Sequence, residues 1–232
     1  MNDATMPDWR AVLFDFDGVI ADTEWAHFET INRTVAPYGI RLSEREYLDG
    51  YVAYDDKGCF RALFEHTLGR RPSPGELQNL IATKTRLLME CIRRRMRPYP
   101  DALEYIRRLR RSRRRPVLGI VSGALRVEIR YILRRLGLTR AFGFIVAAED
   151  VRHGKPSPEP FLKGYRLACQ FAGCRLPKRS VAVIEDSVNG VIAARRAGMV
   201  AAGVAHTFPA ARLRRAGADL VVRRLTQLPV PE

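Results

Sequence analysis

The sequence contains no long hydrophobic run, few cysteines and almost no lysine. No apolar stretch approaches the roughly 18 residues that a membrane-spanning helix needs, so we expect no membrane association. The four cysteines match no zinc-binding spacing and are too few for a small disulfide-stapled scaffold. The first residues are polar and include Asp3, which is not the pattern of a secretory signal. The expected compartment is therefore the cytoplasm.

Charge of one sign dominates what is present. Lysine and arginine together number 40 against 25 aspartates and glutamates, a formal net charge of +15, and only five of the 40 are lysine. Polyanion binding is one explanation, and a compositional bias towards arginine is another. The densest arginine stretches, residues 93–97 and 107–115, have few aromatic residues near them for stacking on bases, only Tyr99 and Tyr105. We therefore favour the bias and expect no specific nucleic-acid partner.

The length and the hydrophobic pattern predict an α/β protein. A chain of 232 residues with 47% apolar and 28% charged residues can bury a sizeable core. Short apolar runs, typical of buried strands, alternate with helical patterns. The runs cover residues 11–16, 116–121, 144–147, 181–184, 200–204 and 220–222. This alternation predicts a doubly wound, Rossmann-like parallel sheet.

One stretch interrupts the alternation, because residues 22–97 are helical in pattern throughout. We interpret them as an α-helical cap domain inserted after the first strand, and residues 1–21 and 98–232 as the core. Asp101 is predicted to cap the next core helix, which reaches about residue 112.

Four short segments rich in functional groups stand at or beyond the ends of predicted strands. In open parallel sheets, ligands bind at the carboxyl ends of the strands, so we expect these side chains to share one site. They are Asp15 with Asp17, Ser122 with Gly123, Lys155, and Glu185 with Asp186.

This set of residue types points to phosphoryl transfer. Carboxylates gathered in one place repel one another unless a cation joins them, and oxygen ligands on strand ends suit Mg²⁺. A lysine and a serine hydroxyl beside the metal suit a phosphate group. One carboxylate can attack phosphorus, and a second can act as an acid and then as a base. The expected reaction therefore uses Mg²⁺ and a small phosphorylated substrate.

The order of these segments resembles the haloacid dehalogenase superfamily, in its phosphatase and phosphomutase branch with a helical cap. The resemblance extends over essentially the whole chain. The matching segments are FDFDGVIADTE at 14–24, SG at 122–123, GKPSPEPF at 154–161 and EDSVNG at 185–190.

The resemblance implies a role for each matching residue. It implies that Asp15 is the nucleophile and a Mg²⁺ ligand. It implies that Asp17 is the general acid and base and contacts the metal through its main-chain carbonyl. Dehalogenases of this superfamily lack an acid at that position and use no metal, so Asp17 favours phosphoryl chemistry. The remaining implied roles are metal holding by Asp186 and Glu185, and phosphoryl binding by Lys155 and by Ser122 with Gly123.

The resemblance also assigns the choice of substrate to the cap. It implies that His27 orients the acid/base residue, that a specificity loop with Gly50 lies near residues 49–56, and that Lys84 reaches the distal end of the substrate. In β-phosphoglucomutases an arginine of this loop holds a second phosphate, whereas Tyr54 falls about where that arginine would be. The cations that could replace it are Arg61, Lys57 and Lys84.

The leading hypothesis is a Mg²⁺-dependent phosphatase that hydrolyses a small phosphorylated metabolite, with a sugar phosphate preferred, through an aspartyl-phosphate. The alternative is a sugar-phosphate mutase of the β-phosphoglucomutase kind. An alternative of a different class is a polyanion-binding protein on an inactive phosphatase scaffold, and the intact set of acids argues against it. We expect a monomer or a homodimer.

Overall fold

The computed structural model describes residues 8–52 and 54–232. The first seven residues and Ala53, which belongs to the predicted specificity loop, lie outside the described residues. The chain divides into two compact units. The sheet unit comprises Met1–Ala21 and Pro98–Glu232, and the helical unit comprises Asp22–Arg97. No helix of the described residues is long and apolar enough to cross a membrane.

The sheet unit is built on six parallel strands in the order β5-β4-β1-β6-β7-β8. The central strand β1 lies between β4 and β6, with Leu13 in register with both Gly119 and Val183. This sheet confirms the predicted α/β class. The strand bounds are β1 Ala11–Phe14, β4 Val117–Val121, β5 Phe144–Val146, β6 Val181–Glu185, β7 Val200–Val204 and β8 Leu220–Val222.

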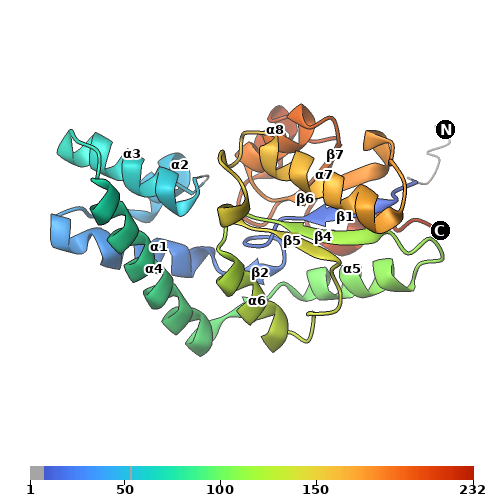
Figure 1. Ribbon diagram of the computed structural model, residues 1–232, viewed down its shortest axis with the longest axis horizontal. Helices are drawn as coiled ribbons and strands as arrows, with labels where there is room; N and C mark the ends of the chain where they lie inside the picture. Colours follow the sequence, from blue (N-terminus) through green and yellow to red (C-terminus); the bar gives the residue numbers. More distant parts are fainter. Residues whose placement is uncertain (1–7, 53) are drawn as a thin grey trace. The chain divides into compact units, whose positions relative to one another are not determined.

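Helices cover both faces of this sheet, with α7 and α8 on one side and α5 and α6 on the other (Figure 1). Because both faces are covered, the central strands bury every residue, as AVLF in β1 and VAVIE in β6 do. The helices are α5 Pro100–Arg111, α6 Arg126–Arg135, α7 Glu159–Ala172, α8 Val188–Arg196 and α9 Ala210–Arg215, with short 3₁₀ turns η2 Ala148–Asp150, η3 Lys178–Ser180 and η4 Leu225–Gln227.

The predicted role of Asp101 is wrong. Helix α5 begins one residue earlier, at Pro100, and its N-cap Tyr99 makes no side-chain capping bond. The Asp101 carboxylate instead accepts a hydrogen bond from the main-chain N–H of Leu225, at 2.6 Å. The Asp101 carboxylate, which the local sequence pattern assigned to the start of α5, therefore bonds to the C-terminal turn η4 instead.

The helical unit contains four α-helices around a core of its own. Helices α2 and α4 start with complete capping boxes, in which Ser43 and Ser73 bond to Glu46 and Glu76. Helix α4 packs against α1 and α3. The elements are α1 Glu24–Val35, η1 Ala36–Tyr38, α2 Glu44–Gly50, α3 Asp56–Leu68 and α4 Pro74–Arg95, and the two-residue strands β2 Ala21–Asp22 and β3 Arg97–Pro98 pair with each other.

Candidate active site

The carboxyl ends of three neighbouring strands bring the predicted acids together. Asp15 directly follows β1, Ser122 directly follows β4, and Glu185 is the last residue of β6. These strands are adjacent and parallel, so their ends share one edge of the sheet. Asp15, Ser122, Glu185 and Asp186 are all buried. The sheet topology therefore creates a buried polar cluster in a place where the chain otherwise buries apolar side chains.

Three carboxylates form a group that could hold a metal ion. One oxygen each of Asp15, Glu185 and Asp186 lies within 4.8 Å of the others. Asp15 Oδ1 and Glu185 Oε1 are buried, and both lie against the ammonium group of Lys155. One lysine cannot balance three buried carboxylates, and a divalent cation with hard oxygen ligands would supply the missing positive charge. The donor set therefore fits Mg²⁺. The side chain of Asp17 is not part of this group, and its contact through the main-chain carbonyl stays a prediction.

Lys155 supplies the positive charge inside this cluster. Its Nζ lies 2.8 Å from Asp15 Oδ1 and 2.5 Å from Glu185 Oε1. Its ammonium group also lies 5.1 Å from the centre of the Phe161 ring. Burial lowers the pKa of Lys155, but the attraction of Asp15 and Glu185 outweighs burial and holds that pKa above its ordinary value. The lysine is therefore charged at neutral pH.

The same cluster changes the acidity of the predicted nucleophile. Burial, followed by repulsion from Glu185, raises the pKa of Asp15 to about 7, although Lys155 opposes the shift. Without a metal, a large fraction of Asp15 is therefore protonated at neutral pH. A cation bound here would favour the carboxylate, which is the form that attacks phosphorus.

Two glycines leave room for the side chains of Asp186 and Glu185. Gly18 has φ of +72°, and a Cβ at this position would lie 1.9 Å from Asp186 Oδ2. A Cβ on Gly190, in the first turn of α8, would lie 1.9 Å from Glu185 Cδ. The close approach of Glu185 therefore explains a glycine that the helix would otherwise disfavour.

The strand end predicted to bind phosphate lies beside the strand ends that carry the acids. Ser122 Oγ accepts a hydrogen bond of 3.0 Å from the main-chain N–H of Ala124, and Gly123 between them is exposed. Two residues beyond the end of β6, Ser187 caps helix α8, and its hydroxyl also donates to Glu185 Oε2 at 2.9 Å. That second bond fixes the orientation of the Glu185 carboxylate.

The site includes a histidine that the sequence analysis left without a role. His206 follows β7, and its Nδ1 donates to the carbonyl oxygen of Gly18 at 2.8 Å. The ring stacks on Tyr99 with centroids 4.0 Å apart, and its Nε2 lies 3.7 Å from Asp101. His206 thus holds the turn that carries Asp17. The only signal in the sequence was its position just beyond a strand.

Two of the predicted substrate residues of the helical unit, His27 and Lys84, contact each other within that unit. Lys84 is 1% exposed, and its Nζ lies 2.9 Å from Asp56 Oδ1 and 3.0 Å from His27 Nδ1. Asp56 therefore balances the charge of Lys84, a pairing that the sequence did not reveal. Gly50 ends α2 with open space around it, and Tyr54 is half exposed. Substrate contacts of His27, Gly50 and Lys84 stay predictions.

Comparisons with known proteins agree on a family. A profile of haloacid dehalogenase-like hydrolases matches residues 12–204. The chain is 27% identical to validoxylamine A 7'-phosphate phosphatase of Streptomyces hygroscopicus subsp. limoneus, over 96% of this chain and 97% of that protein. It is 28% identical to the phosphorylated carbohydrates phosphatase of Thermotoga maritima, over 86% of this chain and 87% of that protein.

A solved structure is similar to this chain in both fold and sequence. CbbY from Rhodobacter sphaeroides, crystallised in complex with phosphate, matches with a TM-score of 0.78 and 25% identity, over 95% of this chain and 96% of that one. The family profile covers most of the chain, from within β1 to the end of β7. The resemblance read from the four motifs is thereby confirmed: the chain belongs to the haloacid dehalogenase-like hydrolases.

Proposed function

We propose that the protein is a Mg²⁺-dependent phosphatase that hydrolyses a small sugar phosphate through an aspartyl-phosphate on Asp15. The observation that carries this proposal is the buried cluster of Asp15, Glu185 and Asp186 around the ammonium group of Lys155. One relative named above is a phosphorylated carbohydrates phosphatase, which supports a sugar phosphate as the substrate class.

The reaction divides into two displacements at phosphorus. A carboxylate oxygen of Asp15 attacks the phosphorus, the bond to the ester oxygen breaks, and Asp17 gives its proton to the departing alcohol. Asp17 then removes a proton from water, which attacks the same phosphorus and breaks its bond to Asp15. Inorganic phosphate leaves, and both aspartates return to their starting forms.

The remaining residues of the cluster hold the charge of the transferred group. Lys155 and Ser122 bind phosphoryl oxygens, with Gly123 leaving space for their approach. Mg²⁺ would be held by Asp15, Asp186, Glu185 and the main-chain carbonyl of Asp17, and would supply positive charge beside the phosphoryl oxygens.

A sugar-phosphate mutase is the second candidate, because the same aspartyl-phosphate can transfer its phosphoryl group to another hydroxyl of the substrate. A mutase must hold a second phosphate while the intermediate turns round. In this chain Tyr54 replaces the expected arginine, and the charge of Lys84 is already paired with Asp56. Both features favour the phosphatase.

We further propose that the protein is a cytoplasmic monomer or homodimer without a nucleic-acid partner.

Substitution of Asp15 by asparagine tests the proposal. We expect Asp15→Asn to abolish phosphate release while the far-ultraviolet circular dichroism and thermal transition remain those of a folded protein. Asp8→Asn is the matched control, because Asp8 is an exposed residue of the sheet unit that pairs with Arg114. Phosphate release by Asp15→Asn at the rate of the control would refute the nucleophile.

A further inference from the structure

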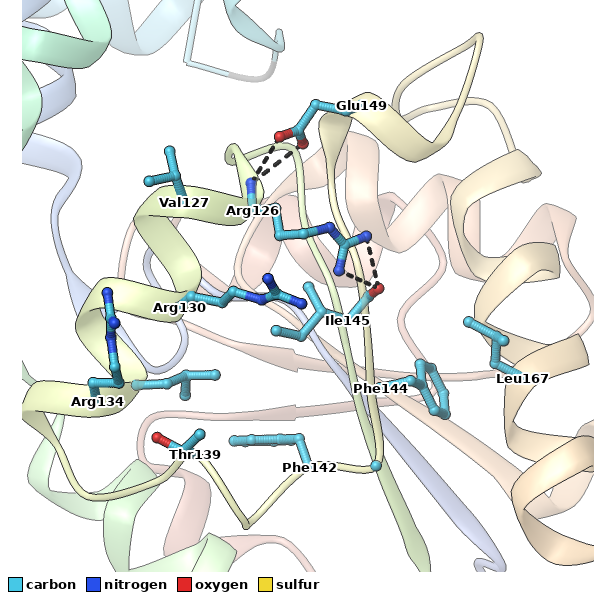
Figure 2. A pocket seen from close by; sticks show the side chains of 12 residues that line it. Arg126, Val127, Arg130, Arg134, Thr139, Phe142, Phe144, Ile145, Glu149 and Leu167 are labelled. Atoms are coloured by element: carbon cyan, nitrogen blue, oxygen red, sulfur yellow. Dashed lines mark hydrogen bonds between the residues drawn. The ribbon is translucent and has the colours of Figure 1, made fainter.

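A pocket lies at the edge of the sheet unit, beside strand β5. It has a volume of about 1000 Å³ and is bounded by helix α6, the segment 139–145 and Leu167 of α7 (Figure 2). None of the residues that line it belongs to the acidic cluster, and none is Ser122, Gly123 or Lys155, the residues predicted to bind phosphate. Its size is that of pockets that bind small organic ligands.

Three arginines of α6 stand in this pocket at intervals of four residues. Arg126, Arg130 and Arg134 therefore occupy one face of the helix. Arg126 is already committed, because its guanidinium donates to the carbonyl oxygen of Ile145 and pairs with Asp150. Figure 2 shows Arg130 extending from α6 towards Ile145.

Arg130 and Arg134 carry charge that nothing in the pocket balances. Within residues 8–52 and 54–232, neither arginine has an ion pair or a side-chain hydrogen bond. Glu149 is the one acidic residue of the described lining, and its carboxylate accepts from the main-chain N–H of Arg126 at 3.1 Å and 3.2 Å. Like charges four residues apart on a helix destabilise it, so an anion between them would relieve that repulsion.

The pocket also has an apolar wall, which consists of Leu133, Phe142, Phe144, Ile145 and Leu167. Val127, another lining residue, is 52% exposed, a high value for such a side chain. A ligand that fits must therefore carry an apolar body as well as a negative charge.

We propose that this pocket binds a small organic anion, in which a sulfonate, carboxylate or phosphate group is attached to an apolar ring system. The anionic group pairs with Arg130 and Arg134, and the ring lies against the apolar wall. A peptide strand is the poorer occupant, because Arg126 already covers the Ile145 carbonyl that an added strand would use. This site does not depend on the reaction proposed for the acidic cluster.

The probe for the experiment is 8-anilinonaphthalene-1-sulfonate, a ring system with one negative charge whose fluorescence rises in an apolar environment. It is titrated into the full-length protein in a buffer without phosphate, which would compete for the same arginines. The variants are Arg130→Ala/Arg134→Ala and Thr139→Trp, the second of which fills the pocket from an exposed position. The control is Arg107→Ala/Arg111→Ala, an exposed pair with the same spacing on α5.

We expect the affinity for the probe to depend on Arg130 and Arg134 and not on Arg107 and Arg111. Removal of Arg130 and Arg134 should weaken binding of the probe at least tenfold, and Thr139→Trp should reduce it as strongly with both arginines present. The control should bind within twofold of the unchanged protein. Equal affinities for the two double variants, or an unchanged affinity in Thr139→Trp, overturn the proposal by placing the probe elsewhere.

Discussion

Replacement of Gly190 by alanine should disturb the acidic cluster through a single methyl group. The new Cβ would lie 1.9 Å from Glu185 Cδ and 2.1 Å from both of its oxygens, far inside van der Waals contact. Glu185 is fully buried, and its carboxylate contacts Lys155 and accepts a hydrogen bond from Ser187, so moving it away from the new methyl group disturbs these contacts. Overpacking of this kind costs about 1–3 kcal/mol of the free energy of unfolding.

Gly75 provides the matched control for this substitution. It also lies in the first turn of a helix, α4, but nothing lies within 4 Å of a Cβ added there. Gly75→Ala should therefore leave stability unchanged or raise it by up to about 1 kcal/mol, the intrinsic preference of a helix for alanine. The two variants make the same chemical change and differ only in their surroundings.

Urea denaturation of both variants, followed by circular dichroism, measures the difference in stability. Because a displaced Glu185 carboxylate moves away from Asp15 and Lys155, we also expect weaker Mg²⁺ binding by calorimetry and slower phosphate release in Gly190→Ala alone. A Gly190→Ala protein as stable as Gly75→Ala, with unchanged turnover, would show that the close packing around Glu185 is not required.

Three further predictions concern the Mg²⁺ dependence of phosphate release, the pKa of Asp15 and the hydrogen bond between His206 and Gly18. EDTA should abolish phosphate release and added Mg²⁺ should restore it; turnover that survives EDTA contradicts a metal in the cluster. Because a proton and Mg²⁺ compete for Asp15, whose pKa is raised to about 7, calorimetric Mg²⁺ affinity should fall by about tenfold per pH unit below that value and level off above it. A Mg²⁺ affinity that stays constant from about pH 5 to about pH 8 would contradict the raised pKa of Asp15. His206→Ala removes the hydrogen bond to Gly18 and should destabilise the protein by about 1 kcal/mol and slow phosphate release, whereas His66→Ala, an exposed histidine of the helical unit, should do neither.

The sequence predicted those parts of the molecule whose signals are local. Strands and helices follow from the hydrophobic pattern, and the carboxyl ends of parallel strands share an edge, so Asp15, Ser122 and Glu185 could be assigned to one site before their distances were known. Gly190 also carried a local signal, since glycine is unfavourable in a helix and needs a reason.

Contacts between distant segments carried no such signal. His206 bonds to Gly18 across 188 positions, and Asp101 bonds to Leu225 across 124. The Asp56 carboxylate that balances Lys84 lies on another helix of the helical unit. Each of these pairs depends on how elements pack, which the local pattern of one sequence does not specify.

The most direct test of the proposed phosphatase is an assay of phosphate release with Mg²⁺ over a panel of sugar phosphates, nucleotides and other phosphorylated metabolites. Formation of glucose 6-phosphate from β-glucose 1-phosphate is measured in parallel. We expect steady release of phosphate from a narrow group of sugar phosphates and no glucose 6-phosphate. Formation of the isomer with little release of phosphate would contradict hydrolysis and identify the protein as a mutase.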